Sequence, residues 1–183
     1  MTRETAFEII DGMIANPSLR AHCLSVGLVC EAYAKENRLN AEDYFIAGLL
    51  HDADYEKFPD QHPKVISKQL REAGEEEIAQ AIDCHGRTFG VPQVSLMDKV
   101  LMASDELTGF VMACAKIRPD GLDTLEESSV AKRFRNPKFA AGVDREEVEF
   151  ALHQLGVEFG SFVTFIIGVL QPHARELNLP TNN

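Results

Sequence analysis

Apolar residues recur with the 3.6-residue period of an α-helix along nearly the whole chain, and no stretch alternates cleanly enough to predict a strand. Together with the turn signals between them, these periodic segments predict an all-α protein. The expected helices span residues 2–15, 18–37, 40–51, 62–73, 75–85, 95–117, 124–134, 144–155 and 157–177. The tail after Asn178 is expected to fray.

Composition narrows the class of protein. Hydrophobic residues make up 45% and charged residues 26% of the chain, as in ordinary globular proteins. The formal net charge of −11 argues against binding to a nucleic-acid polymer or to an anionic membrane, since both require clustered Lys and Arg. The longest apolar run, within residues 162–170, is far shorter than the roughly 20 residues that span a bilayer. Four cysteines without C-x-x-C spacing are typical of buried, reduced thiols, and we expect a cytoplasmic protein.

Four polar residues lie on the apolar faces of different expected helices: His22, His51, His85 and Asp105. Taken alone, each is best interpreted as a core polar residue with a hydrogen-bond partner, because burial of such a group without one costs several kcal/mol. Taken together, they suggest another reason for burial. Imidazole and carboxylate are the usual ligands of divalent first-row metals, and ligands from separate helices can meet inside a helical bundle.

The adjacent pair His51–Asp52 is the sharpest element of this set. It follows an expected helix, where neighbouring side chains can point into one cavity, and the two oxygens of an Asp can bridge two metals. Water bound between two metals becomes a nucleophile at neutral pH. His62 carries little information in its local pattern, and His153 and His173 are interpreted as structural or surface residues.

The order and context of these residues resemble a known signature. The segments Arg20-Ala-His22, Ala47-Gly-Leu-Leu-His51-Asp52 and Lys99-Val-Leu-Met-Ala-Ser-Asp105 are similar to the H…HD…D pattern of the HD-domain superfamily of metal-dependent phosphohydrolases. His62 and His85 match the two extra histidines of its binuclear branch. The stretches that follow His51 and Ser104 look closest to a group of predicted HD-superfamily hydrolases.

The resemblance implies a fold, a ligand set and an activity. The fold would be an HD-type helical bundle at residues 1–118, with a C-terminal helical extension at 119–183 packed on it. One metal would be held by His22, His51, Asp52 and Asp105, and Asp52 would bridge to a second metal on His62 and His85. Asp52 and Asp105 would be the catalytic residues. The two divalent ions could be Fe, Mn, Co, Ni, Zn or Mg, and the substrate would be a small phosphorylated, nucleotide-like molecule.

The sequence departs from the family at one position. Many HD enzymes continue the motif as H-D-x-G-K, with a lysine thought to contact phosphate, whereas Asp54-Tyr55 stands here. Lys57 and Arg87 are the candidate substitutes, and each can also be interpreted as a solvated surface cation. Asp105, Asp54 or Glu56 would handle the proton.

Two other functions fit the same residues. Some HD-domain proteins use a di-iron centre to cleave C–H bonds with O₂, and the same six ligands would serve such an oxygenase. A binding module that keeps its metal without turnover is the third hypothesis, although degenerate relatives often lose a histidine or the central Asp.

Overall fold

The computed structural model describes residues 1–182, and within them the chain is all-helical with no strand, as the apolar period predicts. The α-helices are α1 (Arg3–Met13), α2 (Pro17–Glu36), α3 (Ala41–Leu50), α4 (Lys64–Glu72), α5 (Glu76–Asp83), α6 (Leu96–Lys116), α7 (Glu127–Phe134), α8 (Arg145–Leu155) and α9 (Phe159–Leu170). Two short 3₁₀ turns, η1 (Arg87–Phe89) and η2 (Gln171–His173), complete the set.

Side-chain caps explain where several helices begin. The Asn16 carboxamide accepts hydrogen bonds from the amides of Ser18 and Leu19, with Pro17 at the first helical position of α2. At the start of α6, Ser95 and Asp98 cap each other's amides, and Asp98 is fully buried. These local signals explain why α2 and α6 begin where they do.

The chain divides into two compact units, Met1–Met102 and Ala103–Asn183. The division falls inside α6, which begins in the first unit and ends in the second. The boundary expected at residues 118/119 concerns the extent of the HD-type bundle, and it stays a prediction.

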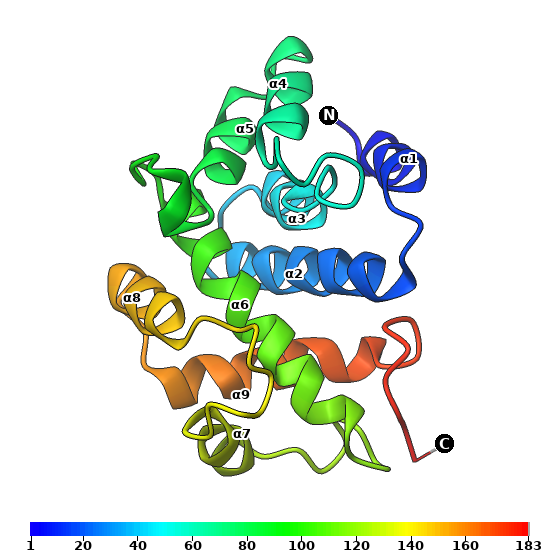
Figure 1. Ribbon diagram of the computed structural model, residues 1–183, viewed down its shortest axis with the longest axis vertical. Coiled ribbons are helices and arrows are strands. Elements are labelled where there is room, and N and C mark those ends of the chain that lie inside the picture. The colour runs from blue at the N-terminus through cyan, green and yellow to red at the C-terminus, as the bar shows by residue number, and fades with distance from the viewer. Residues whose placement is uncertain (183) are drawn as a thin grey trace. The chain divides into compact units, whose positions relative to one another are not determined.

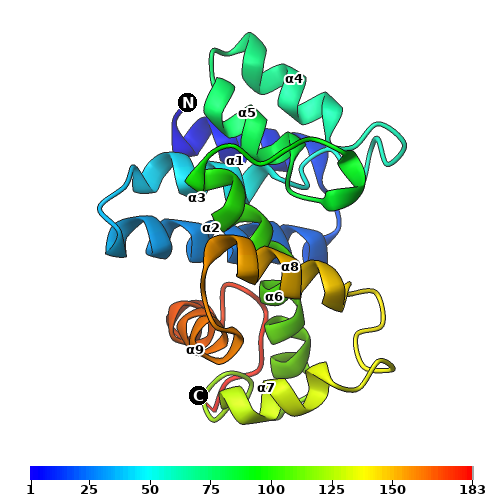
Figure 2. The same cartoon turned by 90° about the vertical axis from the view of Figure 1, so that its left-hand side faces the viewer.

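In the first unit, α3 is the central helix. It contacts α1, α2 and α5, and Figures 1 and 2 both show it between α2 and α5. Seven consecutive residues of α3, from Tyr44 to Leu50, are buried, as expected of a helix covered on several sides. The α2–α3 contact depends on two glycines. A Cβ on Gly48 would lie 2.7 Å from the Cα of Gly27, so the two backbones could not approach this closely with larger residues.

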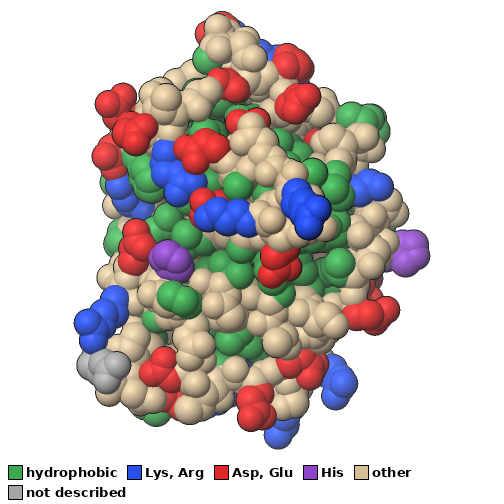
Figure 3. All heavy atoms as spheres, turned by 180° about the vertical axis from the view of Figure 1, so that it is seen from behind, with side chains coloured by type: hydrophobic (Ala, Val, Ile, Leu, Met, Phe, Trp, Pro, Cys, Tyr) green, Lys and Arg blue, Asp and Glu red, His purple; other side chains and the backbone are tan. Residues whose placement is uncertain are grey.

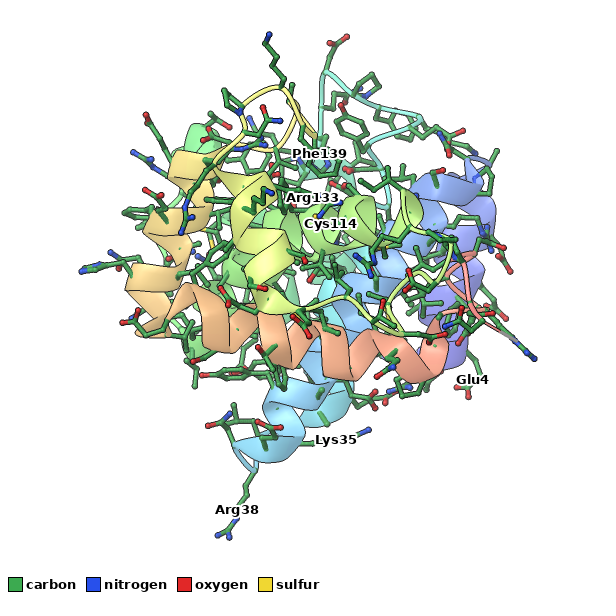
Figure 4. The ribbon with its side chains drawn as sticks, turned by 90° about the horizontal axis from the view of Figure 1, so that it is seen from below. Glu4, Lys35, Arg38, Cys114, Arg133 and Phe139 are labelled. Carbon is green, nitrogen blue, oxygen red and sulfur yellow. The ribbon has the colours of Figure 1, made fainter. Side chains whose placement is uncertain are left out.

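The second unit contains an aromatic core. Phe110 on α6 contacts Phe134 and Phe139, with ring centroids 5.3 and 5.5 Å apart. The guanidinium of Arg145 lies over Phe110 and donates to the carbonyls of Ala140 and Val143, so this arginine joins the 135–144 loop to the core. Figure 4 shows Cys114, Arg133 and Phe139 close together in the same unit, where Arg133 lies 5.9 Å from the Phe139 ring centroid.

The end of the chain differs from its sequence-based expectation. The tail was expected to fray after Asn178, but Leu177 and Leu179 are buried and the Asn182 amide donates to Asp123. A Cβ on Gly121, whose φ is +52°, would lie 1.8 Å from the Pro180 carbonyl oxygen. The expectation was wrong because Leu179 is buried, and because Pro180 and Asn182 contact the 118–124 turn. The last expected helix is also shorter: α9 ends at Leu170, and the 3₁₀ turn η2, which contains Pro172, follows it.

Charged side chains are mixed on the surface. On the face shown in Figure 3, acidic and basic side chains are interspersed. No single helix within residues 1–182 is long and apolar enough to cross a membrane. One pair of consecutive helices, Arg145–Leu155 and Phe159–His173, reaches the required length and apolar composition when taken together, but it is bent by 94°.

Candidate metal centre

Four histidines and one aspartate of the first unit converge at one place. His22 lies on α2, His51 and Asp52 directly follow α3, His62 precedes α4, and His85 comes two residues after α5 ends. The His51 side chain is fully buried, and those of His62 and His85 are 7% and 5% exposed. Asp52 and His22 are more open, at 18% and 21%, so solvent reaches the cluster beside these two residues.

The two oxygens of Asp52 face different pairs of histidines. Oδ2 lies 3.8 Å from His22 Nε2 and 3.5 Å from His51 Nε2. Oδ1 lies 3.3 Å from His62 Nε2 and 3.8 Å from His85 Nε2. The ligand atoms form two groups that each lie within 4.8 Å, His22–His51–Asp52 and Asp52–His62–His85, and Asp52 belongs to both.

Hydrogen bonds orient three of the rings with Nε2 toward Asp52. His51 Nδ1 lies 2.7 Å from the Gly48 carbonyl oxygen, and His85 Nδ1 lies 2.6 Å from that of Ile82. His62 Nδ1 lies 2.7 Å from Asp54 Oδ1. Because a carbonyl or carboxylate can only accept, each Nδ1 carries the proton. In the neutral ring, Nε2 therefore presents a lone pair to the centre.

This donor set fits divalent metal ions. The Nε2 atoms of His22 and His51 lie 3.2 Å apart, the spacing of two ligands on one metal with bonds of about 2.1 Å. His51 Nε2 is an acceptor, so either His22 donates to it or both nitrogens face a shared cation. The carboxylate oxygen beside them favours the cation, because it adds a third electron-pair donor and negative charge at the same point.

Asp54 holds His62 in place, a role that the sequence did not reveal. Its side chain is fully buried, and Oδ2 accepts hydrogen bonds from the amides of Val65 and Ile66 in the first turn of α4. Oδ1 binds His62, so one carboxylate fixes both a helix start and a ring of the cluster. The signal available in the sequence was an Asp two residues after the His-Asp pair and eight before a histidine at a helix start.

The cations and acids singled out from the sequence have other contacts. The Lys57 ammonium donates to the Gly12 carbonyl at 2.6 Å and lines a pocket of about 570 Å³ between α1, the 57–58 segment and α4. The Glu56 carboxylate accepts from the amides of Ala15 and Asn16, which link α1 to α2. Arg87 is exposed on η1, two residues after His85. Substrate binding by Lys57 and Arg87 stays a prediction.

Asp105 belongs to the second unit, where it lies on α6. Burial, together with the charges of Asp105 and Glu147, raises the pKa of the neighbouring Glu106 to about 8. The structure describes the five residues of the first unit as a cluster, and the ligand role of Asp105 stays a prediction from the sequence. His153 is exposed on α8, and His173 contacts Glu176.

The four cysteines are buried free thiols, as expected. Cys84 precedes His85, and burial raises the pKa of its thiol to about 12. The Cys84 sulfur donates to the Ala81 carbonyl, and it belongs to neither of the two ligand groups, whose donors are nitrogen and oxygen atoms.

Comparison with known families agrees with this geometry. Residues 19–109 match the family model described as HD domain. No curated protein and no solved structure matches the chain significantly. The matched range contains all five clustered residues and Asp105. The chain therefore carries an HD domain and belongs through it to the HD-domain superfamily, whose members are generally metal-dependent hydrolases that bind divalent ions.

Proposed function

We propose that the chain is a metal-dependent phosphohydrolase that acts on small phosphorylated, nucleotide-like molecules in the cytoplasm. The reaction would split a phosphate ester with water, R–O–PO₃²⁻ + H₂O giving R–OH and HPO₄²⁻. The observation that carries the proposal is the division of Asp52 between two histidine pairs, with Oδ2 toward His22 and His51 and Oδ1 toward His62 and His85.

The residues of the chain have separate tasks in this proposal. His22 and His51 would hold one divalent ion, His62 and His85 a second, and Asp52 would bridge the two. Asp105 would complete the first ligand set, as the family resemblance implies. Bound divalent ions supply an acidified water and neutralise the charge that develops on the phosphate. The hydrogen bonds to Gly48, Ile82 and Asp54 keep the three rings from turning away.

Elemental analysis of purified protein tests the metal part of the proposal. The wild-type chain, loaded with Mn²⁺, Fe²⁺ or Co²⁺, should carry two ions, and Asp52→Ala should carry none, because it loses the oxygen shared by both groups. His62→Ala should keep about one ion. His153→Ala removes an exposed histidine from α8 and serves as the control, with two ions retained.

Phosphate release from a panel of nucleotides and phosphomonoesters tests the activity. Release by the loaded wild-type chain and its loss in Asp52→Ala would support hydrolysis. Tight metal binding without turnover of any substrate class would instead indicate a binding module, and an iron-specific electron paramagnetic resonance signal after aerobic purification would indicate an oxygenase. Equal losses of metal in Asp52→Ala and His62→Ala would contradict the bridging role.

A further inference from the structure

Two aromatic rings border the His62 side of the metal centre. Tyr55, in the turn after Asp54, lies with its ring centroid 5.3 Å from that of His62 at an interplanar angle of 88°. Phe89, at the end of η1, lies 5.5 Å from His62 and 5.0 Å from His85. Both histidines belong to the group that faces Asp52 Oδ1, so Tyr55 and Phe89 border the same half of the cluster.

The two rings differ in how they are held. Phe89 folds back over Gly86, where an added Cβ would lie 2.9 Å from its ring, and it is half-buried. Tyr55 is 52% exposed although it stands beside a histidine that is only 7% exposed. Phe89 is therefore packed against Gly86, whereas about half of the Tyr55 side chain, beside His62, is open to solvent.

An exposed ring at this distance can recognise the part of a substrate next to its phosphate. The Tyr55 ring centroid lies 5.3 Å from that of His62, so the substituent of a phosphate ester bound beside His62 can contact the Tyr55 ring. Aromatic rings stack on planar π-systems, which a nucleoside phosphate has in its base and a sugar phosphate lacks. Stacking of one base on an aromatic side chain contributes about 1–3 kcal/mol, which corresponds to roughly 5- to 150-fold in affinity.

We propose that Tyr55, supported by Phe89, determines specificity by stacking on the planar base of a nucleoside phosphate. The inference rests on the proposed phosphohydrolase function and narrows its substrate class. It excludes simple sugar phosphates as the preferred substrates, although their ester bond would be equally reactive.

A matched pair of substrates tests the inference on the metal-loaded, full-length chain. Adenosine 5′-monophosphate and ribose 5-phosphate both release phosphate from a primary alcohol, and they differ in the base. We expect kcat/KM for the nucleotide to exceed that for the sugar phosphate about tenfold or more. Tyr55→Ala should abolish most of this preference, and Tyr55→Phe should retain it because the ring face remains.

Tyr33→Ala is the control, since Tyr33 lies eleven residues beyond His22 on α2, about 16 Å along the helix. It should keep the wild-type preference. Equal kcat/KM for the two substrates in the wild-type chain would overturn the inference and leave the hydrolase function intact. A decrease in kcat/KM of the same size for both substrates in Tyr55→Ala would also overturn the inference.

A binding measurement separates this inference from the proposed function. Adenosine carries no phosphate, so its binding can be followed by saturation-transfer NMR whether or not the chain is a phosphohydrolase. We expect saturation transfer to the base protons of adenosine with the wild-type chain and with Tyr55→Phe, and no such transfer with Tyr55→Ala. If neither phosphate ester is hydrolysed, the proposed function fails; if adenosine shows no Tyr55-dependent signal, the stacking role fails.

Discussion

Asp54 connects the metal centre to the helix that follows it. Its two oxygens accept different hydrogen bonds: Oδ1 accepts from His62 Nδ1, and Oδ2 accepts from the amides of Val65 and Ile66. A carboxylate that accepts a ring N–H fixes the tautomer and increases the basicity of the other ring nitrogen. The effect is local to His62, because His51 and His85 are oriented by backbone carbonyls instead.

Asp54→Asn should weaken one of the two metals. The amide oxygen can still accept from Val65 and Ile66, but its NH₂ group would face His62 Nδ1, where two donors cannot pair. His62 would then carry its proton on Nε2 and lose its ligand lone pair. We expect a drop of about 10–100-fold in the affinity for one ion and little change for the other, measured by metal titration followed by elemental analysis.

Glu56→Gln is the matched control for this change. Glu56 is also a carboxylate of the same segment, but it accepts from Ala15 and Asn16 rather than from a histidine. It should leave both affinities unchanged. An equal loss of affinity for both ions in Asp54→Asn would contradict the assignment of Asp54 to His62 alone.

The residues of the cluster could be predicted from the sequence better than the residues that orient them. His22, His51 and His85 could be found because polar residues on apolar helix faces need a reason to be buried. The role of Asp54 could not be predicted, because it depends on how residues 55–61 bring His62 back to the end of α3. Lys57 and Glu56 were candidates by proximity in the chain, and their contacts with Gly12, Ala15 and Asn16 depend on the packing of α1.

Among the helices, the α2–α3 pair determines the position of His22 and His51. The two helices approach closely at Gly27 and Gly48. Gly48 also supplies the carbonyl that orients His51, one turn further along. Close packing and ligand orientation thus depend on the same residue.

Gly48→Ala should therefore reduce both stability and metal binding. The added Cβ would lie 2.7 Å from the Gly27 amide nitrogen and Cα, and backbone atoms cannot move aside as a side chain can. We expect a loss of about 1–3 kcal/mol in the free energy of unfolding, measured by denaturant titration, and weaker binding of the ion at His22 and His51.

Gly12→Ala on α1 tests whether the effect comes from crowding. Its Cβ would meet no atom within 4 Å, so the higher helix propensity of alanine should stabilise the chain by about 0.5–1 kcal/mol. If Gly48→Ala were as harmless as Gly12→Ala, the close approach of α2 and α3 would not be essential.

The limits of sequence reasoning at this scale lie at the ends of helices. The first helix was expected to end at residue 15, but α1 ends at Met13; Asn16 already caps α2, in which Pro17 is the first residue. The helix expected at 157–177 ends at Leu170 and continues as a 3₁₀ turn, because Pro172 has no N–H to donate to the carbonyl four residues before it. Apolar period identified every helix, whereas capping and proline geometry determined where each one ends.

For the whole molecule, the sequence and the structure describe the division of the chain differently. The family resemblance implies a boundary at residues 118/119, beside a turn that contains proline and glycine, whereas the compact units divide within α6 at residues 102/103. A turn signal reports local backbone geometry, but compactness depends on which side chains pack together. All five clustered ligands fall in the first unit on either division.

Metal binding should therefore stabilise the fold in a way that can be measured on the intact chain. The ligands come from α2, the end of α3, the segment before α4 and the end of α5, so an ion bound among them joins elements that separate on unfolding. At a free metal concentration of about 100 times Kd, the gain is about 2.7 kcal/mol, which raises Tm by roughly 5–10 °C for a chain of this size. Calorimetry of the chelator-treated chain, before and after addition of Mn²⁺, should show this rise. Asp52→Asn should abolish most of it, and a rise of equal size in that variant would place the stabilising ion elsewhere.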